Sequence, residues 1–214
     1  MKLAIPGWDI PTLAVAGSDE RIAVRRVFCM GLNYHDHKKE MGITTDVPPF
    51  VFTKATWHAI GCAADRVTDI KYPTKTTNYQ WECELTAVIG KTCANVSAAK
   101  ANDYVWGYAV GLDMTRRDLQ LWCKDNALPW EIGKDVEQSG PVGAVVPASK
   151  MGHPTSGALW LTCNGATKQK SDIGQMILDT PHIVEWLSSY YTLEPGDVIM
   201  TGTPGGIGPV QVGD

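Results

Sequence analysis

The sequence lacks the features that mark several common classes of binding protein. Its six cysteines are scattered, with no C-x-x-C pair and no neighbouring histidine cluster, so neither a zinc finger nor a thioredoxin-type redox motif is supported. The formal net charge is −4 at pH 7 and no basic run occurs. Because nucleic-acid binding needs clustered Lys and Arg, we expect no nucleic-acid partner. No segment approaches the ~20 consecutive apolar residues of a membrane span, so we expect no membrane partner either.

A secretion signal is also missing, because the apolar start of the chain is broken at Pro6-Gly7 after only a few residues. Scattered cysteines without such a signal predict a cytoplasmic protein with reduced thiols. The 214 residues are 44% hydrophobic and 20% charged, which is typical of one well-filled globular domain. We expect most of the eight tryptophans to lie in the core or at an oligomer interface.

Short apolar segments separated by turns predict that strands dominate the fold. The predicted strands are residues 27–30, 50–52, 81–89, 104–112, 160–163 and 198–201. Their irregular spacing is typical of neither a helical bundle nor a regular βαβ sheet, so the sequence predicts a single α+β, strand-dominated domain. Residues 1–26 are interpreted as a short N-terminal leader of strand and turn, and residues 27–214 as the main domain.

Helices are predicted in two places. Thr115-x-x-Asp118 has the spacing of a capping box and predicts a helix beginning there. Residues 173–191 have helical spacing of apolar side chains and precede a turn containing Pro195-Gly196. The polar run 34–41 is expected to form a short helix or a mobile loop outside the core.

An acidic pair gives the strongest chemical signal. On a strand, Glu82 and Glu84 project to the same face with Cα atoms about 6.5–7 Å apart. An isolated pair of this kind more often faces solvent, but Trp81 before it and the apolar run 85–89 after it place these carboxylates at the mouth of a buried strand. Asp113 ends another apolar strand. Acids converging from strand ends can hold a hard divalent cation, although Asp113 also fits the N-cap of the following helix.

A second polar cluster surrounds His37. On a helix, His37 and Glu40 are three residues apart and share a face. A carboxylate that orients an imidazole gives a general base able to activate water near neutral pH. Taken alone, this cluster fits a solvated loop of mixed charge better.

The glycine-rich segment 201–208 does not predict a nucleotide site. It lacks the G-K-[ST] of a P-loop and does not match G-x-G-x-x-G. We expect instead a loop that lets the backbone and Thr203 approach a small ligand closely.

Taken together, these motifs resemble the fumarylacetoacetate hydrolase family from about residue 27 to the end. The matching segments are 31–37, 49–54, 81–85, 111–120, 163–165, 193–197 and 201–204. Within that family, segments 113–120 and 129–134 look like the bacterial fumarylpyruvate hydrolase branch, which acts in aromatic catabolism through the gentisate pathway.

The resemblance implies a mixed β-roll fold for a catalytic domain over residues 27–214, a homodimer, and a small acidic oxo-acid substrate. It implies Mg²⁺ or Mn²⁺ bound by Glu82, Glu84 and Asp113, beneath a lid that carries His37 and Glu40. It further assigns pocket positions to the side chains of Lys54, Arg117, Gln120, Lys134 and Thr203.

The implied reaction is metal-dependent hydrolysis of a carbon–carbon bond in an acylpyruvate, from fumarylpyruvate to fumarate and pyruvate. His37, oriented by Glu40, activates the water, and Lys134 with Gln120 stabilises the oxyanion. An oxaloacetate decarboxylase or a 2-hydroxy-diene-dioate isomerase on the same scaffold is the alternative, and a metal-binding protein without turnover is less well supported.

Two positions depart from the family pattern. The chain ends at Asp214, where relatives usually continue with a further strand, so we expect a truncated roll. Leu32 occupies a position where relatives often carry a polar or basic residue, which leaves substrate recognition there open.

Overall fold

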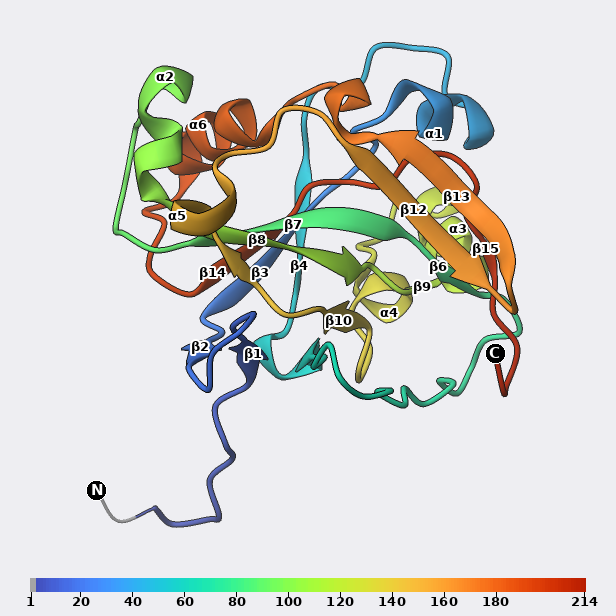
Figure 1. The fold of residues 1–214 in the computed structure, drawn as a ribbon. Coiled ribbons are helices and arrows are strands. Elements are labelled where there is room, and N and C mark those ends of the chain that lie inside the picture. The colour runs from blue at the N-terminus through green and yellow to red at the C-terminus, as the bar shows by residue number, and fades with distance from the viewer. Residues whose placement is uncertain (1–2) are drawn as a thin grey trace.

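The computed structural model describes residues 3–214, and its centre is a curled, mixed eight-stranded sheet (Figure 1). The strand order is β4-β3-β14-β7-β8-β10-β5, with β11 paired to β8 off this path. The strands are β3 (Arg26–Met30), β4 (Val51–Lys54), β5 (Ala59–Gly61), β7 (Cys83–Ile89), β8 (Val105–Leu112), β10 (Gly140–Val142), β11 (Val146–Pro147) and β14 (Asp197–Met200). The predicted strand-dominated α+β roll is confirmed.

Three smaller sheets surround this one. They are the pair β1 (Thr12–Ala14) and β2 (Arg21–Ala23), the hairpin β12 (Ala158–Cys163) and β13 (Ala166–Asp172), and a three-stranded sheet of β15 (Gly208–Pro209), β6 (Tyr79–Trp81) and β9 (Thr115–Arg116). Leu13 and Val24, within the segment predicted as a leader, pack into the same core as Val27 and Val198 of the main sheet.

The helices are short and lie around the sheet. They are α1 (His35–Glu40), α2 (Ala98–Ala101), α3 (Arg117–Asp125), α4 (Glu131–Lys134), α5 (Ala148–Met151) and α6 (Thr180–Tyr190), with 3-10 turns at Thr56–His58, Asn102–Tyr104 and Ile173–Gln175. Figure 1 places α2 and α6 together at one end of the sheet, and α1 at the other end beside the β12–β13 hairpin. In residues 3–214 no helix has the length and apolar character needed to cross a membrane.

Strand β7 explains how the core is built. All seven of its residues are buried, and alternate side chains enter different clusters because a strand has a period of two. Leu85, Ala87 and Ile89 pack in the cluster that receives α6, whereas Val88 packs in the cluster on the other face. Because β7 is covered on both faces, the polar residues at its beginning are held in fixed positions.

The predicted strands are found within a residue or two of their expected bounds, but two helix predictions need correction. Thr115 does not cap a helix: it lies in β9 and its hydroxyl donates to the Asp113 carbonyl at 3.1 Å. Helix α3 therefore begins at Arg117. The helix expected over 173–191 is confined to Thr180–Tyr190, because the side chain of Asp179 caps it by accepting from the N–H of His182 at 3.1 Å.

The segment 34–41 forms the short helix α1, but it is not outside the core, since Tyr34 and His37 are 0% and 5% exposed. The expectation that most tryptophans lie in the core or at an oligomer interface was wrong as regards the core. Of the eight, only Trp81 is buried, while four others are more than half exposed: Trp8, Trp57, Trp122 and Trp160.

Candidate active site

Three carboxylates meet where β7 begins and β8 ends. The antiparallel register pairs Glu84 with Gly111, and the N–H of Asp113 donates to the carbonyl of Glu82 at 2.9 Å. One oxygen from each of Glu82, Glu84 and Asp113 lies within 4.8 Å of the others, and all three residues are buried. Asp113 therefore joins the acid cluster and does not cap α3.

Cations face two of these carboxylates. The Lys134 ammonium, at the end of α4, donates to Glu82 Oε2 at 2.7 Å and to Asp113 Oδ2 at 2.9 Å. The Arg117 guanidinium, at the start of α3, donates to the other oxygen of Glu82. The Lys54 ammonium lies 2.9 Å from Asp113 Oδ1 as an ion pair. The sequence brings these three cations together from β4, α3 and α4.

Glu84 has no such partner among residues 3–214, and its carboxylate accepts one backbone hydrogen bond, from Gly202 at 2.8 Å. Asp113 Oδ1, although close to Lys54, is not aligned for a hydrogen bond. Buried carboxylate oxygens without compensation are costly, and oxygen ligands are what Mg²⁺ and Mn²⁺ prefer. The cluster thus fits a divalent cation, with Glu84 supplying charge that no side chain neutralises.

The acid–base balance of the cluster follows from these contacts. Burial raises the pKa of Glu84 well above its usual range, and the neighbouring charges of Asp113 and Glu82 add to the effect. Burial also opposes ionisation of Glu82, but Lys134 and Arg117 outweigh it and hold the pKa of that carboxyl well below its usual value. The pKa of Lys134 is raised because Asp113 and Glu82 overcome the effect of burial. Lys134 therefore stays charged at neutral pH.

The turn after β14 positions Glu84 and a hydroxyl. Gly202 has φ of 99°, and a Cβ there would come within 2.6 Å of the Cβ of Asn33, so glycine is required. The Thr203 hydroxyl donates to the Cys83 carbonyl at 3.0 Å and accepts from Gln169 Nε2 at 2.8 Å. The glycine-rich segment thus holds the metal-site strand and presents Thr203 to the cavity.

Helix α1 brings the second predicted cluster to the same place. His37 Nδ1 lies 3.4 Å from Glu40 Oε2, and the Glu40 carboxylate accepts from the N–H of Gly206 at 3.2 and 3.3 Å. The imidazole is 5% exposed. Glu40 is thus anchored to the turn after β14 while it faces the ring of His37.

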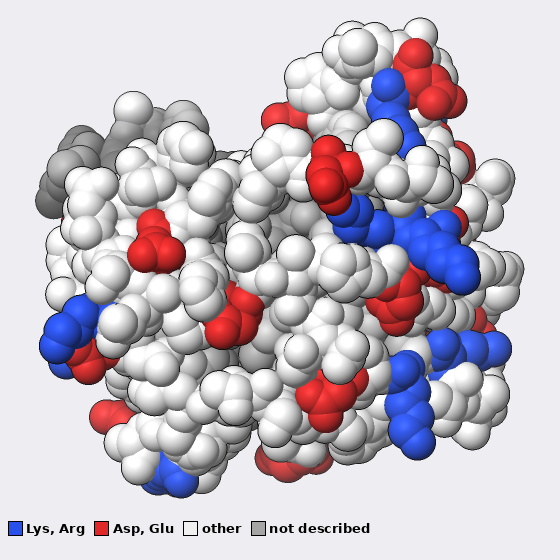
Figure 2. All heavy atoms as spheres, turned by 90° about the horizontal axis from the view of Figure 1, so that it is seen from above, with Lys and Arg blue, Asp and Glu red and all other residues white. Residues whose placement is uncertain are grey.

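These groups line one cavity of about 450 Å³. Its polar lining residues are Glu82, Glu84, Asp113, His37, Arg117, Gln120, Lys134 and Thr203. Its apolar lining residues include Leu32, Met41, Ile43, Val47, Phe50, Phe52, Leu121 and Trp130. On the face that Figure 2 shows, basic and acidic side chains are interspersed and no large patch of one charge appears.

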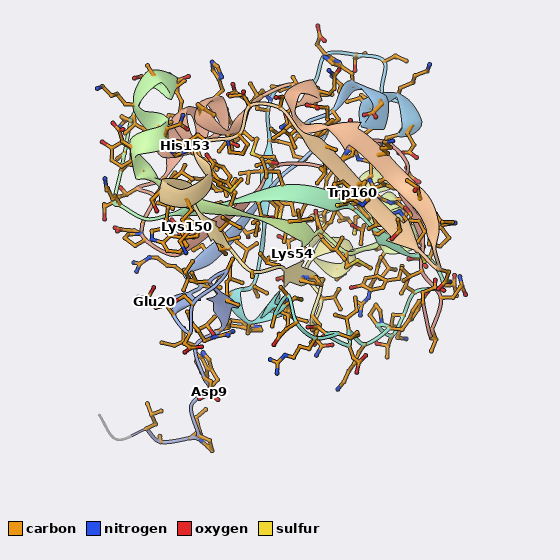
Figure 3. The ribbon with its side chains drawn as sticks, viewed as in Figure 1. Asp9, Glu20, Lys54, Lys150, His153 and Trp160 are labelled. Carbon is orange, nitrogen blue, oxygen red and sulfur yellow. The ribbon has the colours of Figure 1, made fainter. Side chains whose placement is uncertain are left out.

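Most of the predicted site residues therefore lie together, but two occupy other places. Lys54 does not line the cavity. Labelled near the middle of the molecule in Figure 3, it is 2% exposed and donates to the carbonyls of Met114 and Lys134 and to the hydroxyl of Ser139. Glu40 also lies outside the lining and reaches the cavity through His37.

Sequence reasoning missed two polar participants. Gln169, 1% exposed, accepts from the N–H of Cys83 at 2.9 Å and donates to Thr203, and nothing in the surrounding polar strand distinguishes it. Lys124 lines the cavity mouth. It stands seven residues after Arg117 on α3, so helical spacing alone was enough to find it.

Comparisons with known proteins agree with this geometry. Residues 26–214 match the family model described as Fumarylacetoacetate (FAA) hydrolase C-terminal. The crystal structure of fumarylpyruvate hydrolase from Pseudomonas aeruginosa in complex with Mn²⁺ and pyruvate superimposes with a TM-score of 0.96 at 43% identity, covering 98% of this chain and 91% of that chain.

Two curated relatives carry different activities. Fumarylpyruvate hydrolase from Ralstonia sp is 43% identical over 165 residues, which is 77% of this chain and 83% of the relative. Mitochondrial oxaloacetate tautomerase from Bos taurus is 42% identical over 190 residues, which is 89% of this chain and 84% of the relative. Identity alone does not separate the two reactions.

Proposed function

The chain belongs to the fumarylacetoacetate hydrolase family, and we propose that it hydrolyses a carbon–carbon bond in an acylpyruvate, with fumarylpyruvate as substrate and fumarate and pyruvate as products. The observation that carries this proposal is a single cavity whose lining combines the carboxylate cluster with a set of large apolar side chains. The 2-oxo acid end of the substrate fits the carboxylate cluster, and the acyl group fits the apolar side chains.

The volume of the cavity supports a substrate longer than oxaloacetate. A cavity of about 450 Å³ falls within the ~300–1,000 Å³ of sites that enclose drug-sized ligands. Oxaloacetate is a four-carbon diacid, and it leaves the apolar walls without a partner. An acylpyruvate extends its acyl group along those walls.

Glu82, Glu84 and Asp113 would hold a divalent cation, which would supply Lewis-acid stabilisation for the negative charge that develops on the pyruvate leaving group. Glu82 and Asp113 are already held by Arg117 and Lys134, so the ligand oxygens are fixed before the substrate arrives. This fixed geometry avoids the cost of ordering the site during the reaction.

His37 is the proposed general base. With Glu40 at 3.4 Å from Nδ1, the carboxylate orients the ring and stabilises the imidazolium that forms when the other nitrogen takes a proton from water. The hydroxide adds to the acyl carbonyl carbon, the bond from that carbon to the pyruvate methylene breaks, and the methylene receives a proton. His37 returns that proton, which balances the step.

Lys134 and Gln120 are the proposed oxyanion donors. Lys134 is charged and lines the cavity, so its ammonium places positive charge beside an oxygen that becomes negative while it stays bonded to Glu82 and Asp113. Gln120 accepts from Arg117 through its carbonyl oxygen, which leaves the amide NH₂ to donate into the cavity. Thr203 is the proposed hydroxyl contact to the substrate.

Lys54 is proposed to act through Asp113 and not through the substrate. Its ammonium is enclosed by three acceptors and by Asp113 Oδ1. It therefore fixes the orientation of a metal ligand from behind the site, as partners outside the ligand set commonly do.

Oxaloacetate chemistry, either tautomerisation or decarboxylation, is the second candidate. The observation that favours it is the 42% identity to the Bos taurus tautomerase over most of the chain. Both candidates use a metal-bound 2-oxo acid, so the distinction depends on what the apolar part of the cavity accepts.

The test uses the purified chain with Mn²⁺ or Mg²⁺. We expect pyruvate and fumarate to appear from fumarylpyruvate, with release abolished by a chelator and by Glu84→Gln. Turnover of oxaloacetate with no cleavage of fumarylpyruvate would contradict the hydrolase proposal and support the second candidate. Lys168→Ala, at an exposed position on β13 outside this cavity, is the control substitution.

We also propose a homodimer in the cytoplasm that acts in aromatic catabolism. The support is four exposed tryptophans, with Trp160 at 60% on β12, and free cysteines throughout the described residues. Light scattering coupled to size exclusion tests the dimer, and a single-chain mass would contradict it.

A further inference from the structure

One face of α3 runs from the metal site to the cavity mouth. Arg117, Gln120, Leu121 and Lys124 all line the cavity, and their spacing of three, four and seven residues places them on one face of the helix. Arg117 contacts Glu82 of the carboxylate cluster. Lys124 is near the other end of the helix, where the side chain is exposed.

Of the lysines and arginines that line the cavity, Lys124 is the one whose charge is available to a ligand. Arg117 and Lys134 are committed to Glu82 and Asp113. Within residues 3–214, Lys124 takes part in no ion pair with a carboxylate. Leu121 and Trp130 line the same cavity as Lys124. A ligand carboxylate that enters beside these apolar side chains loses part of its water, which strengthens its attraction to a cation at the same cavity.

The distances match a substrate with charge at both ends. Along α3, the rise from Arg117 to Lys124 is about 10.5 Å. Helical side chains lean toward the N-terminus of their helix, and those of Arg117 and Lys124 lean alike, so the axial separation of the two positions is not changed by the lean. The seven carbons of an extended fumarylpyruvate place its carboxyl carbons about 7 Å apart, at ~1.2 Å for each bond. With up to about 4 Å more for an ion pair, its distal carboxylate comes within reach of Lys124 when the 2-oxo acid end lies at the carboxylate cluster.

We propose that Lys124 is a specificity-determining residue that pairs with a carboxylate at the distal end of the acyl group, so that the enzyme selects long dicarboxylic 2-oxo acids. This inference rests on the proposed function, because it places the 2-oxo acid end at the metal site. Lys124 touches neither the reacting carbons nor the metal ligands. Its contribution is to binding, so it appears in KM and not in kcat.

Two ligands that differ only in the distal group test the proposal without turnover. 2-Oxopimelate and 2-oxoheptanoate share the 2-oxo acid end and the seven-carbon length, and neither has the bond that an acylpyruvate hydrolase cleaves. We expect the Mn²⁺-loaded wild-type protein to bind the diacid about 5- to 20-fold more tightly by calorimetry, from one partly exposed charge pair. Lys124→Ala should remove this preference and leave the affinity for 2-oxoheptanoate unchanged.

Two further variants complete the experiment. Lys124→Arg should keep most of the preference, because it retains the charge. Lys150→Ala, which removes an exposed lysine of α5 that does not line this cavity, should behave as wild type. Raising the salt concentration should reduce the preference in wild type and leave Lys124→Ala unaffected.

Three outcomes would overturn the proposal: a preference for 2-oxopimelate that survives in Lys124→Ala, a wild-type preference for 2-oxoheptanoate, or no binding of either ligand. The first would assign the distal carboxylate to another cation, and the second would assign the cavity to apolar acyl groups. A Lys124-dependent preference in a protein that does not cleave fumarylpyruvate would instead contradict the proposed reaction and keep the ligand class.

Discussion

The N–H of Gly202 donates to the carboxylate of Glu84 at 2.8 Å, and within residues 3–214 no Lys, Arg or His side chain pairs with that carboxylate. Glu82 and Asp113, by contrast, each face a buried cation. The three ligands are therefore not equivalent. Glu84 is the one whose charge the folded chain leaves for the metal to neutralise.

Because Glu84 is the ligand without a cationic partner in the described part of the chain, Glu84→Gln tests its role in metal binding directly. The substitution keeps the shape and removes a buried charge whose ionisation is disfavoured, so the metal-free variant should be at least as stable as wild-type protein in thermal unfolding. Wild-type protein should gain about 2.7 kcal/mol at a Mn²⁺ concentration 100 times the Kd, and the variant should gain little of this. A metal-free variant that melts well below wild type would show that Glu84 has a structural partner.

Metal affinity should depend on pH in the direction that Glu84 sets. Its pKa is raised by burial and by the charges of Asp113 and Glu82, so protons compete with Mn²⁺ for this carboxylate. The Kd for Mn²⁺, measured by calorimetry, should therefore increase as the pH falls from 8 toward 6, with proton release on binding. A Kd that is constant over this range would contradict the expectation.

The same shift has the opposite consequence for the metal-free fold. A carboxyl whose pKa is raised on folding binds protons more tightly in the folded state, so its contribution to stability is greatest below its unfolded pKa of ~4.3 and is lost as the pH rises through the folded pKa. Saturating Mn²⁺ removes this loss by occupying the site. The stabilisation by Mn²⁺ in thermal unfolding should accordingly be larger at pH 8 than at pH 6.

Lys54→Met should destabilise the protein strongly. Lys54 is 2% exposed, and its removal leaves Asp113 Oδ1 without its ion-pair partner and the acceptors at Met114, Lys134 and Ser139 without their shared donor. Removing one partner of a buried pair costs about 3–5 kcal/mol, which urea unfolding can measure. Lys168→Met, at an exposed position on β13, is the matched control and should change stability by less than about 0.5 kcal/mol. Equal stability in the two variants would contradict this role for Lys54.

The sequence predicted which acidic residues form the site more accurately than it predicted where the neighbouring helix begins. Glu82, Glu84 and Asp113 could be found because strand periodicity and strand ends are local signals. The cap assigned to Thr115 was wrong because a local motif cannot show that β9 pairs with β6 across 35 residues or more of chain: Thr115 pairs with Gln80.

The hydrogen bonds of Lys54 could not be predicted from the sequence either, because its acceptors come from residues 60 to 85 positions away. The expectation of tryptophans in the core was wrong for Trp57 and Trp160, which are 62% and 60% exposed in the single chain. The expectation of tryptophans at an oligomer interface stays a prediction. Contacts that depend on the assembled sheet, or on a second molecule, leave no periodic trace in the sequence.

His37 and Glu40 give the prediction that separates chemistry from metal binding. Neither side chain lies in the carboxylate cluster, so His37→Asn should leave the Kd for Mn²⁺ within about twofold of wild type. It should lower kcat for fumarylpyruvate by about 10²–10⁴-fold, which is the usual contribution of a general base. Glu40→Gln keeps the hydrogen-bonding shape and removes only the charge that stabilises the imidazolium, so its loss should be smaller.

Measuring the Kd for Mn²⁺ and kcat together in His37→Asn and Glu40→Gln separates the two roles that α1 could have, because neither side chain lies in the carboxylate cluster. A parallel fall of metal affinity and rate in either variant would mean that α1 supports the metal site and does not supply the base.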